Sequence, residues 1–407
     1  VQALESIFDI TVPQHIQAMR RAMYCGEWLQ SHSLHIHMLA APDFLGFNSI
    51  IEMAEQYSDV VQRGLHLQSL GNRLIELFGA RSVHPVGVCV GGFHHLPAQQ
   101  NIDELISDLE NALEQAEALI LWTARLNLPN EEQDFISVAL RHETDYPMNY
   151  GRLVSSNGLD IDINEFENHF SEQHVPHSTA LHALLDGKPY LVGPLARINL
   201  NRDRLSPQLE NILSSINFPF PSQNMFHSIV ARAIEIFIAI EESITLLKTI
   251  TPDISIKQNV VPRAGTGYGC SEAPRGILWH RYDVEQDGLI EAARIVPPTS
   301  QNQARIEQDL HTSLTQFGLD KDEDALRLQG EKVIRNYDPC ISCATHFLKL
   351  DLRRYDNTPD KPLNPSLRQM PHHFVWNKLG RTLCADGVSH MNVVKQSSSS
   401  QLCIIGI

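Results

Sequence analysis

The 407-residue sequence is short of positive charge: it has 32 Lys and Arg residues against 48 Asp and Glu residues, which gives a formal net charge of −16. A basic surface is the usual footprint of a nucleic-acid-binding protein, so this balance argues against nucleic acid as a partner. The sequence also lacks an apolar run of the roughly 18 residues that a membrane-spanning helix needs, and no secretory signal is visible. We therefore predict a cytoplasmic protein without a membrane span.

The sequence is also poor in cysteine. Its seven cysteines follow no regular spacing, which argues against a disulfide framework and is typical of a reducing compartment. Only Cys340 and Cys343 stand close together, and one turn of backbone would direct both sulfurs to a common point, as in sites for soft metals. A bare CxxC pair is also compatible with two ordinary buried thiols. No βαβ pattern precedes it to suggest a thioredoxin-like site.

Apolar residues recur at helical intervals through most of the chain, which predicts a mainly α-helical protein. The expected helices are 13–40, 49–78, 102–126, 207–216, 225–247 and 322–336. Pro42 should end the first of these, with Asp43 just beyond it, and Gly64 and Gly71 indicate a bend or a close helix crossing in the second. The helix at 225–247 is apolar on most faces and should lie at the centre of a bundle.

The middle of the sequence departs from this helical pattern. Short strand-like pieces alternate with turn signals between residues 134 and 205, which predicts an α+β insertion. The expected strands are 135–140, 190–192 and 196–200. Three histidines of the insertion have no spacing that suggests a metal site, and we assign them no chemistry: His174, His177 and His182.

The insertion would divide the helical body into a first part, residues 1–133, and a second part, residues 206–350. The second part is expected to contain a hairpin, formed by residues 278–284 and 289–296, and to end with the CxxC pair. Residues 351–407 include four prolines and a run of serines and show no sustained periodicity. We expect them to form an irregular or disordered tail.

The segment from Asp338 to His346, with the sequence DPCISCATH, resembles the C-terminal metal motif of the large subunit of nickel-iron hydrogenases. The resemblance extends in order over roughly residues 1 to 350. Its other parts are the family's helix that ends in Pro-Asp (31–46), its HP…GG loop (84–92), its EAPRG segment (271–276) and the hairpin that follows (282–290). The sequence is most similar to the soluble cytoplasmic branch, which couples hydrogen to nicotinamide cofactors or related carriers.

This resemblance implies a long-helix bundle around a buried metal centre, and the heterolytic cleavage or formation of H2 at a nickel-iron site. Cys340 is the implied terminal nickel ligand, and Cys343 the implied bridge to an iron that carries diatomic ligands. Thiolates suit these roles because they are soft ligands and can be shared between two metals. His346 is implied in holding a magnesium ion.

The resemblance also implies three catalytic residues outside the CxxC pair. Arg275 would hold a positive charge over the metals, and Asp43 and Asp338 would orient it as neighbouring carboxylates. Taken alone, Arg275 is also compatible with a surface salt bridge, and Asp43 with a turn or a helix cap. The base that accepts the proton from H2 is open between Cys340 and Arg275.

One departure from the family pattern matters. The family has a second cysteine pair, in an RxCGxC motif upstream of the helix that ends in Pro-Asp, and this sequence has none; Cys25 precedes a glycine but has no second cysteine. We therefore expect an N-terminally truncated chain that lacks two sulfur ligands and is inactive alone. An RxCGxC motif encoded upstream of Val1 would support the enzyme, whereas a start codon there without the motif would support a non-catalytic scaffold.

Electrons must leave a buried centre, but the sequence has no cysteine spacing typical of an iron–sulfur cluster. The resemblance therefore implies a small subunit that carries iron–sulfur clusters, with diaphorase-type subunits beyond it that pass electrons to NAD(P) or a similar carrier. A further alternative is a relative of the quinone-reducing subunit of respiratory complex I. That subunit lacks the metal cysteines, so Cys340 and Cys343 argue against it.

Overall fold

The computed structural model describes residues 1–47, 49–178, 180–251 and 255–339, together with the backbone of three C-terminal strands. The chain divides into two compact units. The first unit comprises Val1–His169 and Tyr190–Pro298, and the second comprises Phe170–Pro189 and Thr299–Ile407. The domain boundaries expected from the sequence stay a prediction.

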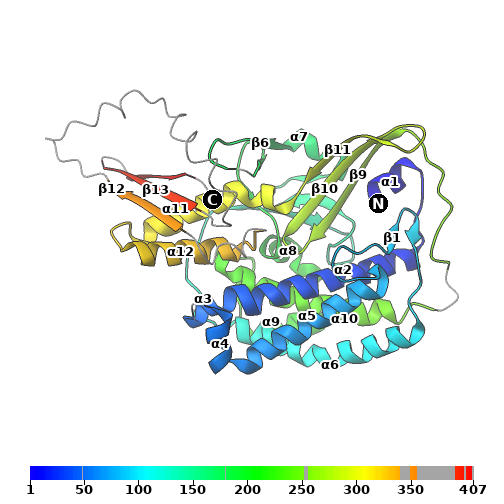
Figure 1. Ribbon diagram of the computed structural model, residues 1–407, viewed down its shortest axis with the longest axis horizontal. Helices are drawn as coiled ribbons and strands as arrows, with labels where there is room; N and C mark the ends of the chain where they lie inside the picture. The colour runs from blue at the N-terminus through cyan, green and yellow to red at the C-terminus, as the bar shows by residue number, and fades with distance from the viewer. Residues whose placement is uncertain are drawn as a thin grey trace. The chain divides into compact units, whose positions relative to one another are not determined.

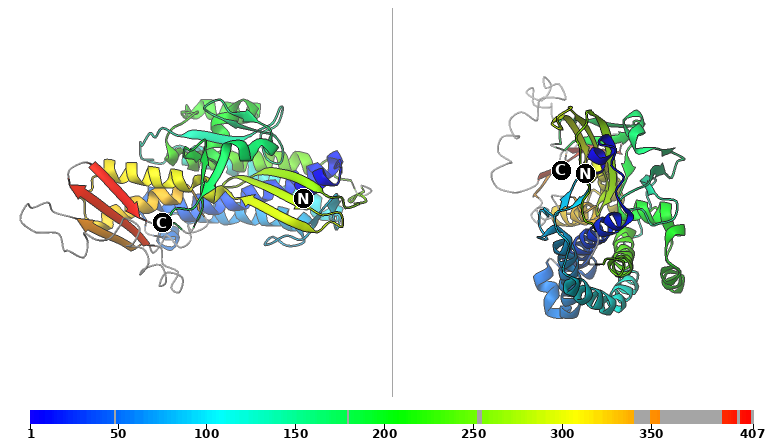
Figure 2. Two further views of the ribbon diagram at one scale, coloured as in Figure 1. Left: turned by 90° about the horizontal axis from the view of Figure 1, so that it is seen from above. Right: turned by 90° about the vertical axis from the view of Figure 1, so that its right-hand side faces the viewer.

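Four long helices pack together in the first unit and form its core (Figure 1). They are α2 (Gln14–Leu34), α5 (Ser58–Gly79), α6 (Gln99–Thr123) and α10 (Ser228–Leu247). Helix α10 packs against both α2 and α6, and the right-hand view of Figure 2 looks along the bundle. Most residues of α10 are buried, which confirms its predicted place at the centre of the bundle.

Glycines allow α2 and α5 to approach closely. A Cβ added at Gly71 of α5 would lie 2.5 Å from the Gln30 backbone nitrogen and 2.7 Å from the Gly26 carbonyl oxygen, both on α2. A Cβ added at Gly64 would lie 2.6 Å from the Cβ of His37. The close helix crossing predicted from Gly64 and Gly71 is therefore confirmed.

Two predicted helices are divided in the structure. Helix α2 continues into a π-helical turn, η1 (His35–Ala40), and then into α3 (Ala41–Leu45), so the prediction that Pro42 ends the helix is wrong. Pro42 lies in α3 directly after the π-helical turn, and because it has no backbone N–H, the helix continues through it with one helical hydrogen bond fewer. The helix predicted at 49–78 is divided at Tyr57 into α4 (Ile50–Gln56) and α5.

The α+β part of the first unit contains a four-stranded sheet in the order β5-β4-β3-β8. Its strands are β3 (Ile136–Arg141), β4 (Arg152–Ser155), β5 (Asp160–Ile161) and β8 (Tyr190–Leu191). The strand predicted at 196–200 is wrong, because this stretch belongs to helix α8 (Pro194–Asn201). Pro194 is favourable at the start of a helix, and the apolar pattern was too short to distinguish the two structures.

A second, three-stranded antiparallel sheet in the first unit has the order β11-β10-β9. Its strands are β9 (Gly265–Ala273), β10 (Gly276–Val284) and β11 (Ile290–Val296), so the predicted hairpin is confirmed. The remaining elements of this unit are short or peripheral. They are α1 (Gln2–Ile7), β1 (Val88–Cys89), β2 (Gly92–Phe93), α7 (Phe166–His169) and α9 (Pro207–Ile216), with 3₁₀ turns η2 (Ile163–Glu165), η3 (Arg202–Arg204) and η4 (Met225–His227).

The second unit combines a small hairpin, two helices and a C-terminal sheet. The hairpin is β6 (Phe170–Gln173) with β7 (His182–Leu185), and the helices are α11 (Pro298–Phe317) and α12 (Glu323–Asn336). The sheet consists of β12 (Lys349–Arg354), β13 (His390–Ser397) and β14 (Ser400–Ile405). Parts of residues 351–407 therefore form strands, and the expectation of an irregular or disordered tail stays a prediction for the segment as a whole. Short apolar runs such as the Leu-Cys-Ile-Ile of β14 favour strands.

Among the residues that the structure describes, no helix is both long enough and apolar enough to cross a bilayer.

The close contact at Gly71 leads to a testable prediction. By helix propensity alone, Gly71→Ala would stabilise α5 by about 1 kcal/mol. Because the new methyl group would meet the backbone of α2, we expect net destabilisation by about 1–3 kcal/mol instead. Thermal unfolding of the purified protein measures this change. Ser69→Ala, at an exposed position of the same helix, is the control and should leave the melting temperature nearly unchanged. A melting temperature for Gly71→Ala at or above that of the parent would contradict the close crossing.

Candidate functional site

Arg275 lies in the tight turn between β9 and β10, where Ala273 and Gly276 pair directly across the hairpin. Gly276 has a φ of +136°, and a Cβ there would lie 2.4 Å from Cγ2 of Val192. A Cβ at Gly193 would lie 2.8 Å from the Arg275 carbonyl oxygen. Glycine is therefore needed on both sides of this contact, which places the turn directly against the start of α8.

The buried guanidinium of Arg197, on α8, holds this turn. Its Nη1 donates to the carbonyl oxygen of Ala273 and its Nη2 to that of Pro274, each at 2.9 Å. These two carbonyls immediately precede Arg275 in the chain. The position of Arg275 is therefore fixed from inside the protein, by a side chain that is 0% exposed.

The same guanidinium pairs with two buried carboxylates. Its Nε and Nη2 donate to the two carboxylate oxygens of Glu235 on α10, each at 2.7 Å, and its Nη1 donates to Oε2 of Glu272 on β9 at 3.0 Å. The ring of Trp28 on α2 lies 4.4 Å from the guanidinium carbon. Because the guanidinium is planar and its N–H donors have fixed directions, bidentate pairing with a carboxylate defines the orientation of the Arg197 side chain.

Each carboxylate is also held by further donors. Glu235 accepts from the hydroxyl of Tyr146 at 2.8 Å, and its other oxygen lies 2.8 Å from Nε2 of His32. Glu272 accepts from the backbone N–H of Leu140 at 2.7 Å. We call Trp28, His32, Tyr146, Arg197, Glu235 and Glu272 the Arg197 network. It connects α2, α8 and α10 of the helical body to β9.

The charges of the Arg197 network follow from burial and pairing. Burial alone would raise the pKa of Glu235, but the charge and hydrogen bonds of Arg197 outweigh it and lower the pKa to about 2. Burial raises the pKa of Glu272 in spite of Arg197. Burial also lowers the pKa of His32 to about 4, so this imidazole is neutral at neutral pH. Glu235 and Arg197 therefore form a buried ion pair, supported by neutral donors.

Arg275 itself is half-buried, and its positive charge interacts with Glu27 on α2. Burial raises the pKa of Glu27 on α2, and the positive charge of Arg275 acts against this rise.

Asp43 lies in the first turn of α3 in the first unit, and Asp338 follows α12 in the second unit. The predicted orientation of Arg275 by Asp43 and Asp338 stays a prediction. Cys340, Cys343 and His346 lie outside the described residues.

The described cysteines are isolated from one another in the fold: Cys25 on α2, Cys89 on β1 and Cys270 on β9 are all free. Burial raises the pKa of the Cys25 thiol and that of Cys270, so both remain protonated at neutral pH. A metal ligand is a thiolate, and these environments do not favour one. The interpretation of Cys25 as separate from any metal pair is consistent with this geometry.

Sequence reasoning missed Arg197 and Glu235. Both missed residues carried a signal. Glu235 is an acid inside an almost entirely apolar helix, and Arg197 follows the apolar Leu195-Ala196. An ionisable residue in such surroundings needs a buried partner of opposite charge.

Comparison with known proteins places the chain among hydrogenases. The family model for nickel-dependent hydrogenases matches residues 165–346. The alpha subunit of sulfhydrogenase 1 from Pyrococcus furiosus is 30% identical over 354 residues, which cover 86% of this chain and 82% of that protein. The alpha subunit of the coenzyme F420 hydrogenase from Methanocaldococcus jannaschii is 25% identical, with coverage of 86% and 78%. The structure of an NAD+-reducing [NiFe]-hydrogenase in the H2-reduced state has a TM-score of 0.77 and 27% identity, and covers 85% of this chain and 83% of that chain.

The buried histidines predict how stability depends on pH. Burial lowers the pKa of His32 and of His37 from 6.5 to about 4, so the unfolded state takes up protons first as the pH falls. Their stabilising effect is present above about pH 6.5 and is lost as the pH falls towards 4. Between about pH 7 and 5, we expect each histidine to account for a loss of roughly 2 kcal/mol in the free energy of unfolding.

Urea unfolding at the two pH values, with and without His32→Gln, measures this effect. Gln can still donate to Glu235 but does not titrate, so the variant should lose clearly less stability on acidification than the parent. His66→Gln, an exposed histidine on α5, is the control and should keep the full pH dependence. An unchanged pH dependence in the His32→Gln variant would show that this imidazole is not kept neutral by burial.

Proposed function

We infer that this chain, which belongs to the large-subunit family of nickel-dependent hydrogenases, is the catalytic large subunit of an oxidoreductase that cleaves or forms H2. The observation that carries the proposal is the Arg275 turn, because its EAPRG sequence is held rigidly by the buried Arg197 network. The family match also extends to residue 346 and so includes the DPCISCATH motif. The alternatives of a scaffold and of a complex I relative are not favoured.

The metal centre would be bound by Cys340 and Cys343, with Cys340 as a terminal nickel ligand and Cys343 shared with an iron that carries diatomic ligands. The donor set fits, because two thiolates at this spacing are soft ligands that can be shared between nickel and iron. The described thiols, by contrast, are isolated. When bound, the centre supplies a site at which H2 is polarised for heterolytic cleavage. His346 would help to hold a magnesium ion.

Arg275 would provide a fixed positive charge beside this centre. A guanidinium is practically never deprotonated in a protein, so its role would be to polarise bound H2 and to orient neighbouring carboxylates rather than to accept a proton. Asp43 and Asp338 are the proposed carboxylate partners. Because the backbone on both sides of Arg275 is held by Arg197 and by the contact at Gly193, the guanidinium starts from a defined position.

The proposed partners follow from the path of the electrons. A relative is named as an alpha subunit, and a similar structure is named as an NAD+-reducing hydrogenase. We therefore propose a small subunit with iron–sulfur clusters and diaphorase-type subunits that pass electrons to NAD(P) or a similar carrier. We also propose a cytoplasmic location, which is consistent with three free thiols in the described residues.

The thiolate pair gives the first prediction of the proposal. Cys340→Ser and Cys343→Ser should each abolish H2-dependent reduction of the electron carrier and the binding of nickel, because a hydroxyl is a poor ligand for nickel. Because this sequence lacks the family's second cysteine pair, the full-length gene product should be used. It should be matured in a host that assembles nickel-iron centres, together with its iron–sulfur partner, and its nickel content measured by elemental analysis. Cys89→Ser, at an isolated cysteine, is the control and should keep both nickel and activity. Full nickel content in Cys343→Ser would refute the assignment.

Arg275 gives the second prediction. Arg275→Lys keeps the charge but loses the planar fork, and we expect turnover of H2 to fall by about 10²-fold or more while the nickel content stays unchanged. Hydrogen–deuterium exchange activity separates this loss from electron transfer to the partner. Arg152→Lys changes an exposed arginine that pairs with Asp160 on the surface and should leave the rate unchanged. Equal rates for Arg275→Lys and the parent would exclude Arg275 from the catalytic site.

A further inference from the structure

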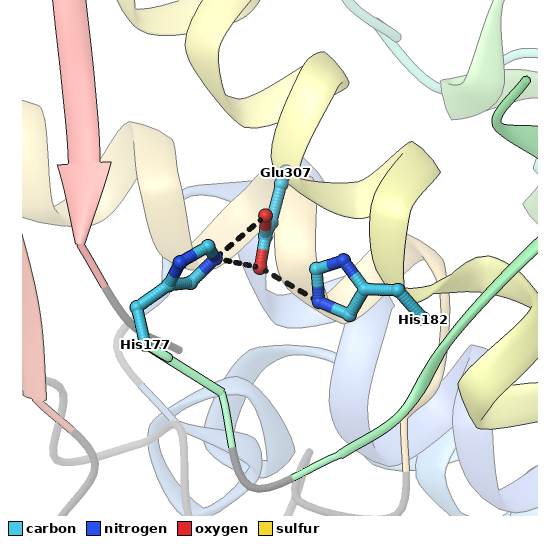
Figure 3. A group of neighbouring side chains, drawn as sticks. All are labelled: His177, His182 and Glu307. Carbon is cyan, nitrogen blue, oxygen red and sulfur yellow. Dashed lines mark hydrogen bonds and ion pairs between the residues drawn. The ribbon is translucent and has the colours of Figure 1, made fainter. Parts of the chain in front are cut away.

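Two histidines of the β6–β7 segment converge in the second unit with a glutamate that is far from them in sequence (Figure 3). Glu307 lies on α11, His182 begins β7, and His177 lies on the connection between β6 and β7. One possible ligand atom from each residue lies within 4.8 Å of the others. We call these residues the His–His–Glu cluster.

The donor atoms of the His–His–Glu cluster have the spacing of a metal site. Nε2 of His177 lies 3.0 and 3.1 Å from the two carboxylate oxygens of Glu307, and Nε2 of His182 lies 3.2 Å from one of them. Donors bound to Zn²⁺ at about 2.0–2.1 Å in a tetrahedron lie roughly 3.4 Å apart. The three possible ligand atoms all lie within 4.8 Å of one another, so small movements of the side chains would admit an ion.

Hydrogen bonding alone does not account for this arrangement. His177 has hydrogen-bond geometry towards Glu307, whereas the buried Nε2 of His182 contacts the same carboxylate at the distance of an ion pair but without hydrogen-bond geometry. A buried polar atom without a hydrogen bond is costly, and a metal ion between His182 and Glu307 would satisfy it.

Burial and charge fit a small cation as well. The side chain of His182 is 4% exposed, whereas those of His177 and Glu307 are 26% and 19% exposed. The cluster is thus closed on one side and open to solvent on the other, where a water could complete the coordination. The carboxylate of Glu307 lies beside both imidazoles and would supply the negative charge that a divalent cation requires.

We propose that His177, His182 and Glu307 form a mononuclear site for a divalent first-row transition ion, for which Zn²⁺ is the best-fitting candidate. Two imidazoles, one carboxylate and one open position are a frequent ligand set for this ion. The site differs from the Cys340–Cys343 pair in donor type, because it offers nitrogen and oxygen instead of sulfur. Bound there, the ion would connect the β6–β7 segment to α11, since Glu307 lies 130 positions after His177 in the sequence.

Zinc binding to the purified protein tests the proposal. After the protein has been washed with a chelator and dialysed against Zn²⁺, we expect one zinc per chain beyond the parent's nickel and iron, measured by elemental analysis. Competition with a chromophoric chelator gives the affinity. Mutation of a residue that only hydrogen-bonds to a metal ligand weakens metal binding by about 10–100-fold. Because His182 and Glu307 are proposed to bind the ion directly, His182→Gln and Glu307→Gln should each weaken Zn²⁺ binding by more than about tenfold.

The control is His174→Gln, which changes an exposed histidine three positions before His177 and should leave zinc binding unchanged. A change at the buried His182 could prevent folding. His177→Gln, at a partly exposed position, therefore provides a second ligand variant that tests the site. Zn²⁺ should also raise the melting temperature of the parent and of His174→Gln, but not of the ligand variants.

The proposal is overturned if the parent binds no zinc after washing, or if folded His177→Gln and His182→Gln bind zinc as tightly as the parent does. The cluster would then be a hydrogen-bonded group without an ion. Because the proposed nickel ligands are Cys340 and Cys343, nickel content should be the same in all of these variants. Failure of this proposal is thus distinguishable from failure of the proposed hydrogenase function.

Discussion

The buried Arg197 guanidinium is the interaction on which the arrangement of the first unit depends. An arginine has five N–H donors, and all five are used: two on the carboxylate of Glu235, one on that of Glu272, and two on the carbonyls of Ala273 and Pro274. A lysine offers only three donors and no planar fork, so it could not hold a helix, a strand and a turn at once. A buried ion pair of this kind contributes little net stability, because the loss of hydration is large. Its benefit is the fixed position of the Arg275 turn.

The helix crossings make this network possible. Trp28 and His32 reach Arg197 and Glu235 from α2, and α2 is held against α5 at a distance that only glycine allows. The opposite side of the network is α10, which is buried on nearly every face and therefore has little freedom to move. The geometry of the Arg197 network, and with it the position of the Arg275 turn, therefore depends on the spacing of the bundle helices. A displacement of α2 would shift Arg197 and therefore also the backbone position of Arg275.

Local patterns in the sequence predicted most of this fold, whereas the partners of buried charges could not be predicted. The period of apolar residues identified the bundle helices, and the turn signal identified the β10–β11 hairpin. Pattern alone failed at α8, because a strand and a short buried helix look alike over five residues. It also could not pair Glu235 with Arg197, which is 38 positions away, or bring His177 to Glu307, because such contacts depend on the complete fold. The CxxC motif could be recognised because its ligands are local.

Donor chemistry, rather than affinity, would distinguish the two metal sites proposed for this chain. In almost any protein site, the affinity for divalent ions increases from iron to nickel to copper, and the affinity for zinc is lower than that for copper. Affinity alone therefore does not exclude nickel from a site that contains histidines. The thiolates of Cys340 and Cys343 can be shared between two soft metals, which the imidazoles of His177 and His182 cannot. The His–His–Glu cluster therefore lacks the bridging thiolates of a nickel-iron centre, whichever ion enters it. Because its open side faces solvent, it can exchange its ion with the surroundings, whereas a buried centre depends on being assembled in place.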